Sequence, residues 1–338
     1  MNKLIHKIFR ELSYQTGWYV SPPEFLSLII TMRCNLRCQS CDIWQKEKGG
    51  ELTEEDWLAI VQKLSILSKD TFVEINGGEP LMKQNLVIKI IKELKKYFKT
   101  VTLNTNGLLI NQEIVEKLKS VGLDTIKLSF YSLDQEIHNY LRGHELAYAQ
   151  AKMAIEIINK KNMGLEIGLL ITAKNIKEAP ELIKYLQTLP RTSIILQPLD
   201  EKIESSESKN LALNKLPASL WPNQKDVDYF FYWLLLNKKN IKNSLPNLMA
   251  LKEYYLNPES VLRFRCFAGQ RNLVIYPTGE VSFCFKRKTV GNLKKQELKE
   301  ILNQSTSERK KIKKCKKYCR IVGCNFSRGL NEFIFNKN

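Results

Sequence analysis

The stretch that decides the fold reads Phe25-Leu26-Ser27-Leu28-Ile29-Ile30-Thr31-Met32-Arg33-Cys34-Asn35-Leu36-Arg37-Cys38-Gln39-Ser40-Cys41. Its first half is an apolar run that is typical of a buried parallel strand. Its second half places Cys34, Cys38 and Cys41 in a Cys-x3-Cys-x2-Cys spacing. Three thiolates can hold a metal centre and leave one coordination position without a protein ligand, whereas a structural site is normally closed by a fourth. The stretch therefore predicts a metal centre with an open position, just beyond a strand.

Other interpretations of the three cysteines have less support. Their odd number and the lack of a secretory signal sequence argue against disulfides. A zinc site needs a fourth ligand nearby, and the only histidines of the chain are His6, His138 and His144. An iron–sulfur cluster is therefore favoured over zinc.

Composition bounds the class of protein. The chain has 338 residues, of which 43% are hydrophobic, so we expect one large α/β domain with a smaller appendage. No apolar run approaches the roughly 20 residues of a membrane-spanning helix, and the cytoplasm is the expected compartment. The net charge of +18 leaves nucleic acid, an anionic membrane surface or an acidic substrate open. Nucleic acid is disfavoured because no RNA- or DNA-binding motif is recognisable.

The order of apolar and amphipathic segments predicts the architecture. Helical patterns near residues 54–67, 85–98, 111–121, 146–161 and 179–189 separate short apolar runs. Those runs, each rich in Ile, Leu and Val, are Phe25–Thr31, Phe72–Ile75, Val101–Asn104, Thr125–Phe130, Leu165–Ile171 and Ser193–Gln197. Six strands alternating with helices predict an α/β fold, a partial (β/α)6 TIM-like barrel with its site at the carboxyl ends of the strands.

Four segments are expected along the chain. Residues 1–22 form an amphipathic segment, for which docking on the domain is favoured over contact with a membrane surface. Residues 23–200 form the barrel domain. Residues 201–260 form a linker with a helical insertion, including a helix over 227–238, and residues 261–338 form a small cysteine-rich extension. The basic run 309–317 in that extension is either a solvated helix face or compensation for the negative charge of a cluster.

A second motif, Asn76-Gly77-Gly78-Glu79-Pro80, follows the second expected strand. Its glycine pair permits tight turning and close approach of a ligand to the backbone. Together with the cysteine triplet one βα unit earlier, this motif makes the chain resemble the radical S-adenosylmethionine (SAM) enzymes. The resemblance implies that the three cysteines ligate three irons of a [4Fe–4S] cluster and that the fourth iron binds SAM. It further implies that electron transfer cleaves SAM and leaves a 5′-deoxyadenosyl radical.

The same resemblance implies a set of SAM-binding residues. Gly77, Gly78 and Glu79, with Pro80 completing the motif, match the segment that holds the methionine amino group. Ser129, in Lys127-Leu128-Ser129-Phe130, matches a polar position that contacts SAM.

Three further positions are candidates with open alternatives. Arg142 would pair with the SAM carboxylate, because a guanidinium fork suits it, or is a surface arginine. Asn106 faces the ligand or is the left-handed residue of a turn. Gln197, which ends the sixth expected strand, is a further candidate.

Five more cysteines lie in the last quarter of the chain: Cys266, Cys284, Cys315, Cys319 and Cys324. Between the first two, residues 272–276 and 281–285 predict a β-hairpin around Pro277-Thr278-Gly279-Glu280. The arrangement resembles the SPASM and twitch auxiliary-cluster extensions of radical SAM enzymes, although the closing spacing of 315, 319 and 324 departs from theirs. Five cysteines supply only one set of four ligands, so we expect one auxiliary [4Fe–4S] cluster. Cys266, Cys284 and Cys315 are expected ligands, Cys319 or Cys324 is the fourth, and zinc stays open there.

These observations together predict a radical SAM enzyme. It would abstract hydrogen from a small molecule, a sugar or a peptide, and its auxiliary cluster would transfer electrons or position substrate. A reducing protein such as a flavodoxin or ferredoxin would supply the electron. The alternatives are an RNA-modifying radical enzyme and an iron–sulfur electron-transfer protein that does not cleave SAM. The intact Gly-Gly-Glu-Pro argues against the last, because an electron carrier needs no SAM site.

Overall fold

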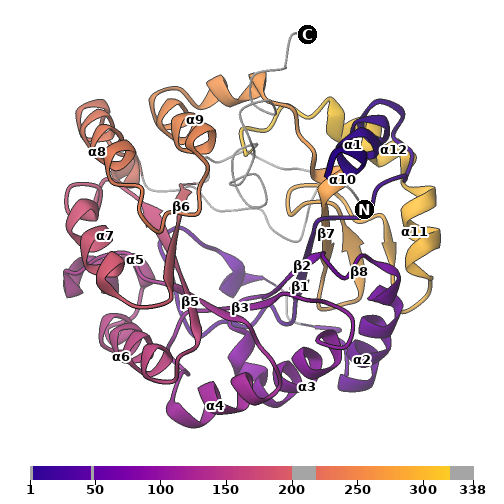
Figure 1. The fold of residues 1–338 in the computed structure, drawn as a ribbon, viewed down its shortest axis with the longest axis horizontal. Helices are drawn as coiled ribbons and strands as arrows, with labels where there is room; N and C mark the ends of the chain where they lie inside the picture. Colours follow the sequence, from indigo (N-terminus) through magenta and orange to yellow (C-terminus); the bar gives the residue numbers. More distant parts are fainter. Residues whose placement is uncertain (1–2, 47–48, 200–217, 320–338) are drawn as a thin grey trace.

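The computed structural model describes residues 3–46, 49–199 and 218–319. Within these ranges nine strands form one sheet in the order β6-β5-β4-β3-β2-β1-β7-β8-β9 (Figure 1). The first six strands are β1 (Phe25–Ile29), β2 (Phe72–Asn76), β3 (Val101–Thr105), β4 (Thr125–Ser129), β5 (Gly164–Ile171) and β6 (Thr192–Pro198). All neighbouring pairs among these six are parallel, as the apolar runs predict.

The inner face of this curved sheet is called the lumen side, and its outer face is covered by helices (Figure 1). They are α2 (Glu54–Lys63), α3 (Gln84–Leu94), α4 (Gln112–Ser120), α5 (Gln135–Arg142), α6 (Ala147–Lys160) and α7 (Ala179–Thr188). Alternate strand residues such as Val73 and Ile75 are fully buried and belong to the same core as Trp57 and Ile90 of the helices. The predicted partial (β/α)6 TIM-like barrel is confirmed.

Local sequence signals fix where the helices begin and end. Thr53 caps α2, because its hydroxyl accepts from the Asp56 amide while the Asp56 carboxylate accepts from the Thr53 amide. Asn111 caps α4 by accepting from the Ile114 amide. Gly122, just beyond α4, has φ +87°, a conformation that ends a helix and favours glycine. The connections after β2, β3, β4 and β5 are short, whereas the connection after β1 is long and contains the three cysteines.

The region after β6 is part of the barrel wall. Helix α8 (Gln224–Leu236), which accounts for the helix predicted over 227–238, packs against α7 and against α9 (Leu245–Leu256). Between these helices, Ile241 forms a parallel bridge to Ile194, and the Lys242 amide donates to the Ile194 carbonyl at 2.8 Å. This segment therefore continues the sheet past β6 by a single bridge, too short for a strand pattern to reveal. The long connection predicted from residue 200 lies largely outside the described residues.

The C-terminal extension continues the sheet on the other side of the barrel. Strand β7 (Asn272–Ile275) pairs parallel to β1, and the antiparallel strands β8 (Glu280–Ser282) and β9 (Gly291–Asn292) follow. The predicted β-hairpin is confirmed, with Gly279 at φ +81° in its turn. Three helices complete the extension: α10 (Ala268–Arg271), α11 (Leu298–Gln304) and α12 (Thr306–Lys313).

The N-terminal helix α1 (Lys3–Thr16) lies beside α10 and α12, which agrees with the expected docking (Figure 1). Docking uses its polar side, since Arg10 donates to Glu24 at 2.6 Å, whereas Ile8 and Phe9 of the apolar stripe are 58% and 38% exposed. Among the described residues, no helix combines the length and hydropathy that a membrane span requires.

Candidate functional site

The cysteine loop, residues 31–41, leaves the carboxyl end of β1 and is held by the loop that follows β2. The Gly78 amide donates to the Thr31 carbonyl and the Glu79 amide to the Arg33 carbonyl, both at 2.8 Å. Cys34, Cys38 and Cys41 are all half-buried thiols in this loop. The two sequence motifs therefore form one interlocked unit.

Glycine is required where the two loops meet. A Cβ added to Gly78 would lie 2.1 Å from the Arg33 carbonyl oxygen, and one added to Gly77 would lie 2.6 Å from the Thr31 carbonyl oxygen. Gly77 also has φ +151°, within the region that disfavours side chains. Pro80 is buried and opens the short helix η3 (Pro80–Lys83) directly after the contact. The glycine pair therefore serves close backbone packing as well as the ligand approach expected from the sequence.

Glu79 is fully buried and ties the ends of β2 and β3 together. Its carboxylate accepts from the Asn106 amide at 2.8 Å, the Thr105 hydroxyl at 2.9 Å and the Leu81 amide at 3.0 Å. Burial raises the pKa of Glu79, and these hydrogen bonds act in the opposite direction. All three of these hydrogen bonds come from groups of the protein itself. Glu79 therefore shapes the site by fixing the loops that follow β2 and β3.

Asn106 links the third strand to the cysteine loop. Its side-chain amide donates to the Asn35 side-chain carbonyl at 2.7 Å, and its own carbonyl accepts from the Leu108 amide at 2.9 Å. The left-handed conformation of this turn belongs to Gly107, with φ +89°, and not to Asn106. Asn106 is therefore not the left-handed residue of the turn, and its contact with a ligand stays a prediction.

Arg142 is a buried cation beside the three cysteines. It ends α5, its Nη1 donates to the Tyr131 hydroxyl at 2.9 Å, and its buried Nε has no hydrogen-bond partner among the described residues. Burial alone would lower the pKa of Arg142, but neighbouring Cys38, Tyr131 and Cys34 raise it above its usual value. The surface-arginine alternative is therefore wrong, because Arg142 is buried. A buried donor without a partner among the described residues is one that a ligand could satisfy.

The turn after Arg142 also requires glycine. Gly143 has φ +63°, and a Cβ there would lie 2.1 Å from the Arg37 carbonyl oxygen of the cysteine loop. His138, one turn earlier in α5, is buried, and its Nδ1 accepts from the Tyr131 amide at 3.2 Å. Burial lowers the pKa of His138 to about 3, so it stays neutral. This histidine supports the backbone after β4 at Tyr131 and is not a candidate for proton transfer.

Ser129 and Gln197 lie at the ends of β4 and β6, on either side of β5. Ser129 pairs in register with Gly168, and a Cβ added to Gly168 would lie 4.0 Å from the Gln197 side-chain oxygen. Both side chains are half-buried. Their positions agree with a role at the carboxyl edge, and SAM binding by either stays a prediction.

The chemistry of the donor set fits an iron–sulfur cluster. Burial raises the pKa of the Cys34 thiol and raises that of Cys41 to about 12, with the other cysteine thiolates of the loop contributing. These thiols need a metal to hold them as thiolates. Among the described residues, no three His, Cys, Asp or Glu side chains surround a single point closely enough for one metal ion. An iron–sulfur cluster does not require the three thiols to surround one point, because each cysteine would ligate a different iron.

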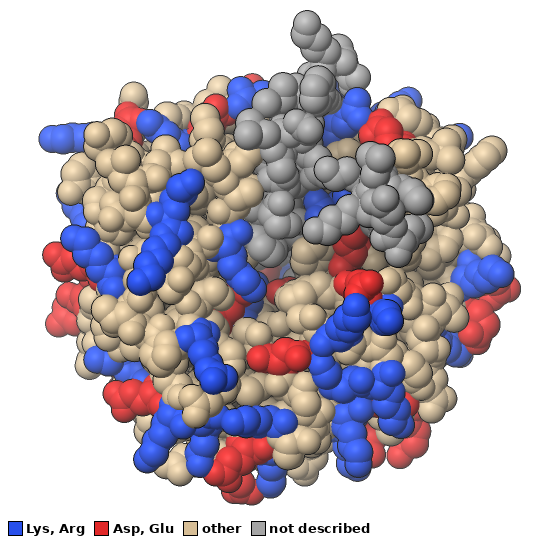
Figure 2. Space-filling view, viewed as in Figure 1, with Lys and Arg blue, Asp and Glu red and all other residues tan. Residues whose placement is uncertain are grey.

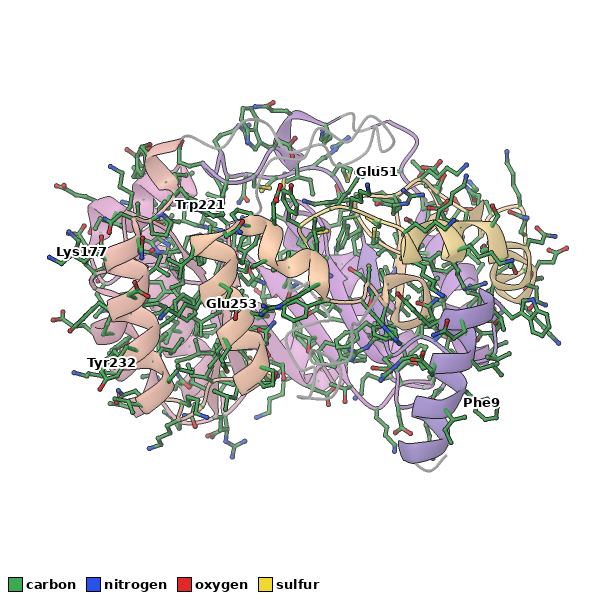
Figure 3. All side chains as sticks on the ribbon, turned by 90° about the horizontal axis from the view of Figure 1, so that it is seen from above. Phe9, Glu51, Lys177, Trp221, Tyr232 and Glu253 are labelled. Carbon is green, nitrogen blue, oxygen red and sulfur yellow. The ribbon has the colours of Figure 1, made fainter. Side chains whose placement is uncertain are left out.

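Glu51 supports the cysteine loop and has no signal in the sequence. Its Oε1 accepts from the Thr31 hydroxyl at 2.7 Å and the Met32 amide at 2.9 Å, and Lys83 of η3 lies 2.6 Å from its Oε2. In the side view of Figure 3, Glu51 lies at one edge of the barrel and Phe9 at the opposite edge. Glu51 thus bridges the start of the cysteine loop to the segment after the Gly-Gly-Glu-Pro motif.

The lumen also carries a chain of ion pairs that periodicity did not single out. Lys127 Nζ of β4 lies 3.2 Å from Glu74 Oε1 of β2 and 3.3 Å from Glu166 Oε1 of β5. Lys242, from the bridge segment after α8, pairs with the other oxygen of Glu166. Lys127 crosses from β4 to β2 over β3, on the side of the sheet away from the helices. The lumen is therefore polar at this level.

Three of the C-terminal cysteines influence one another electrostatically. Burial raises the pKa of Cys284 to about 12, and Cys266 and Cys315 are close enough to raise it further. Cys284 follows β8, and its amide donates to the Ser282 hydroxyl at 3.3 Å. Cys319 is half-buried, and Cys324 lies outside the described residues. The charges of Cys266 and Cys315 thus act on Cys284, and the ligand set of the auxiliary site stays a prediction.

Two protein-family models match this chain, one over the region of the cysteine loop and one over the C-terminal extension. The model of the radical SAM superfamily matches residues 28–186, which include the cysteine loop and the strands β2 to β5 of the barrel. The model of an iron–sulfur cluster-binding domain, SPASM, matches residues 266–325, which include all five C-terminal cysteines.

Individual proteins are similar over different lengths. A probable GTP 3′,8-cyclase of Sulfurisphaera tokodaii is 29% identical over 48% of this chain and 51% of the cyclase, so the chain spans about half of that relative. An AdoMet-dependent heme synthase of Methanosarcina barkeri is 23% identical over 85% of this chain and 84% of the synthase. The solved structure of native anSMEcpe with bound AdoMet and Cp18Cys peptide has a TM-score of 0.66 at 19% identity, covering 93% of each chain, and shares the fold.

Proposed function

The chain belongs to the radical SAM superfamily, and on that premise we propose that it cleaves SAM reductively at a cluster held by Cys34, Cys38 and Cys41. The observation that carries this proposal is the buried Arg142, whose Nε has no partner within the described part of the chain, while the three cysteines lie within electrostatic reach. A buried guanidinium next to thiolates fits the carboxylate of a ligand bound at the same centre.

Each element of the site has a part in this proposal. Cys34, Cys38 and Cys41 would hold the cluster, which when reduced would supply the one electron that cleaves a carbon–sulfur bond of SAM into methionine and a 5′-deoxyadenosyl radical able to abstract hydrogen from substrate. The protein holds SAM with Arg142 at its carboxylate and the backbone of Gly77 and Gly78 at its amino group. Ser129 and Gln197 contact it from β4 and β6, and Asn106 and Glu79 fix the loops.

The substrate lies in the lumen, next to SAM. The ion-pair chain through Lys127 supports a substrate with polar groups, since a lumen adapted to a wholly apolar molecule would not carry it. A small polar molecule, a sugar or a peptide segment satisfies this requirement. Comparison of metabolites and peptides in cells with the intact chain and with the Cys34→Ala variant would identify the compound.

SAM cleavage is the first prediction. Anaerobically reconstituted protein given SAM and dithionite should release 5′-deoxyadenosine, measured by chromatography. The matched control is the Cys34→Ala/Cys38→Ala/Cys41→Ala variant, which keeps the C-terminal cysteines and should release none. An intact cluster in the parent protein, seen by electron paramagnetic resonance (EPR), without any release of 5′-deoxyadenosine would overturn the proposal.

We also propose one auxiliary [4Fe–4S] cluster on Cys266, Cys284, Cys315 and either Cys319 or Cys324, which transfers electrons or positions substrate. The electrostatic influence of Cys266 and Cys315 on Cys284 supports it. The triple alanine variant should retain about four iron and four sulfide per chain, because a four-cysteine set holds one such cluster. Adding Cys284→Ala should remove that iron. Zinc in place of iron and sulfide would contradict this assignment.

A further inference from the structure

The surface of the cysteine loop carries two exposed arginines. Arg33 precedes Cys34 directly and Arg37 precedes Cys38, and both side chains are exposed while the cysteines themselves are half-buried. A cluster on these cysteines would therefore lie just beneath a surface marked by two positive charges.

Two acids close to this surface, both within the described ranges, are already paired. Asp42 lies 3.2 Å from Lys46, and Glu51 lies 2.6 Å from Lys83. Both carboxylates are nearly buried, with side-chain exposures of 5% and 8%. Among the residues that the structure describes, neither arginine forms an ion pair, so the loop presents net positive charge to solvent.

Arg37 is fixed in place. Its Nη1 donates to the Cys34 carbonyl at 3.0 Å and the Leu36 carbonyl at 2.9 Å, and its guanidinium stacks 4.8 Å from the centre of the Trp44 ring. Trp44 in turn donates from Nε1 to the Cys41 carbonyl at 3.0 Å. Arg37 and Trp44 thus hold both ends of the triplet, and the charge stays at a defined position over it.

The positive net charge of the whole protein does not by itself identify the surface of the cysteine loop as a docking site. Figure 2 shows Lys and Arg side chains spread widely over one face of the molecule, with acidic side chains among them. A second concentrated group exists on α12, where Lys310 and Lys311 are exposed a few residues before Cys315 of the auxiliary site. An electron could therefore enter at the cysteine loop or at the auxiliary site. Substituting the basic residues of one surface by acidic ones would distinguish the two.

We propose that the Arg33–Arg37 surface is the docking site of a small acidic one-electron carrier protein of the flavodoxin or ferredoxin type. The inference rests on the proposed SAM cleavage, which consumes one electron each time. One electron would leave the reduced carrier and enter the cluster directly beneath the contact. Complementary charge steers such encounters and weakens with salt, and it accelerates association of charged proteins by one to three orders of magnitude.

Binding and electron delivery of a bacterial flavodoxin test this proposal. Arg33→Glu should weaken flavodoxin binding at low ionic strength at least tenfold and flatten its salt dependence. It should also lower, at least tenfold, the ratio of 5′-deoxyadenosine formed with pre-reduced flavodoxin to that formed with dithionite. Arg33→Lys, which keeps the charge at the position that Arg33→Glu reverses, should bind flavodoxin like the parent protein. Lys310→Glu/Lys311→Glu is the matched charge control on α12 and should leave both readouts unchanged.

The outcomes separate the two proposals. Unchanged flavodoxin binding in Arg33→Glu, or a loss confined to Lys310→Glu/Lys311→Glu, would overturn the docking site and point to entry at the auxiliary cluster. Failure of dithionite to release 5′-deoxyadenosine from the parent protein would instead overturn the proposed function. The binding measurement still decides the docking site in that case, because it does not depend on turnover.

Discussion

Gly78→Ala is expected to abolish SAM cleavage, with at least a hundredfold loss of 5′-deoxyadenosine formation. A Cβ at this position would lie 2.1 Å from the Arg33 carbonyl oxygen, which is backbone and has no rotamer by which to move away. The hydrogen bond from the Glu79 amide to the same carbonyl would break as the two loops separate. Cys34 follows Arg33 directly, so its thiol would leave the position that the cluster needs.

The stability cost of the same substitution is moderate. Overpacking costs about 1–3 kcal/mol and loss of a hydrogen bond about 1 kcal/mol, which predicts a fall of roughly 2–4 kcal/mol in the free energy of unfolding. The experiment measures iron content, chemical denaturation and 5′-deoxyadenosine formation together. Gly49→Ala is the matched control, because a Cβ there would meet nothing within 4 Å, and it should behave like the parent. A Gly78→Ala protein with full iron content and normal turnover would refute the packing argument.

The sequence was sufficient for the parts of the site that depend on topology. The carboxyl ends of successive parallel strands share one edge, so Cys34 after β1 and Gly78 after β2 had to be neighbours. The role of Glu79 could not be foreseen in the same way. Whether its carboxylate faces a ligand or the Asn106 amide depends on the path of two loops, and loop paths follow no periodicity.

Two other residues escaped prediction for different reasons. Glu51 follows the cysteine loop in an irregular segment, and only the folded chain shows that it accepts from Thr31 and Met32. Lys242 belongs to a segment that joins the sheet by a single bridge at Ile241, too short to give strand alternation. Its ion pair with Glu166 spans 76 residues of sequence, and neither residue belongs to a motif.

Arg142→Met is expected to weaken SAM binding at least thirtyfold while leaving the cluster in place. Removing one partner of a buried charged pair typically costs about 2–5 kcal/mol, and methionine keeps much of the apolar volume. Arg142→Lys should recover only part of the affinity, since an ammonium supplies the charge without the planar fork that pairs with a carboxylate. The dissociation constant is measured anaerobically with radiolabelled SAM on oxidised, reconstituted protein, so that no turnover occurs.

Iron content and the thermal midpoint of each variant separate ligand binding from folding. Arg263→Met provides the control, because Arg263 forms an exposed ion pair with Glu253 and its loss should change SAM affinity by less than twofold.

Tyr131→Phe adds a second comparison. It removes the hydroxyl that accepts from Arg142 Nη1 but keeps the guanidinium, so SAM should still bind, with an affinity within about tenfold of the parent. Parent-like SAM affinity in an iron-replete Arg142→Met protein would show that this arginine serves the loop alone, and that the unpaired Nε does not mark the SAM carboxylate.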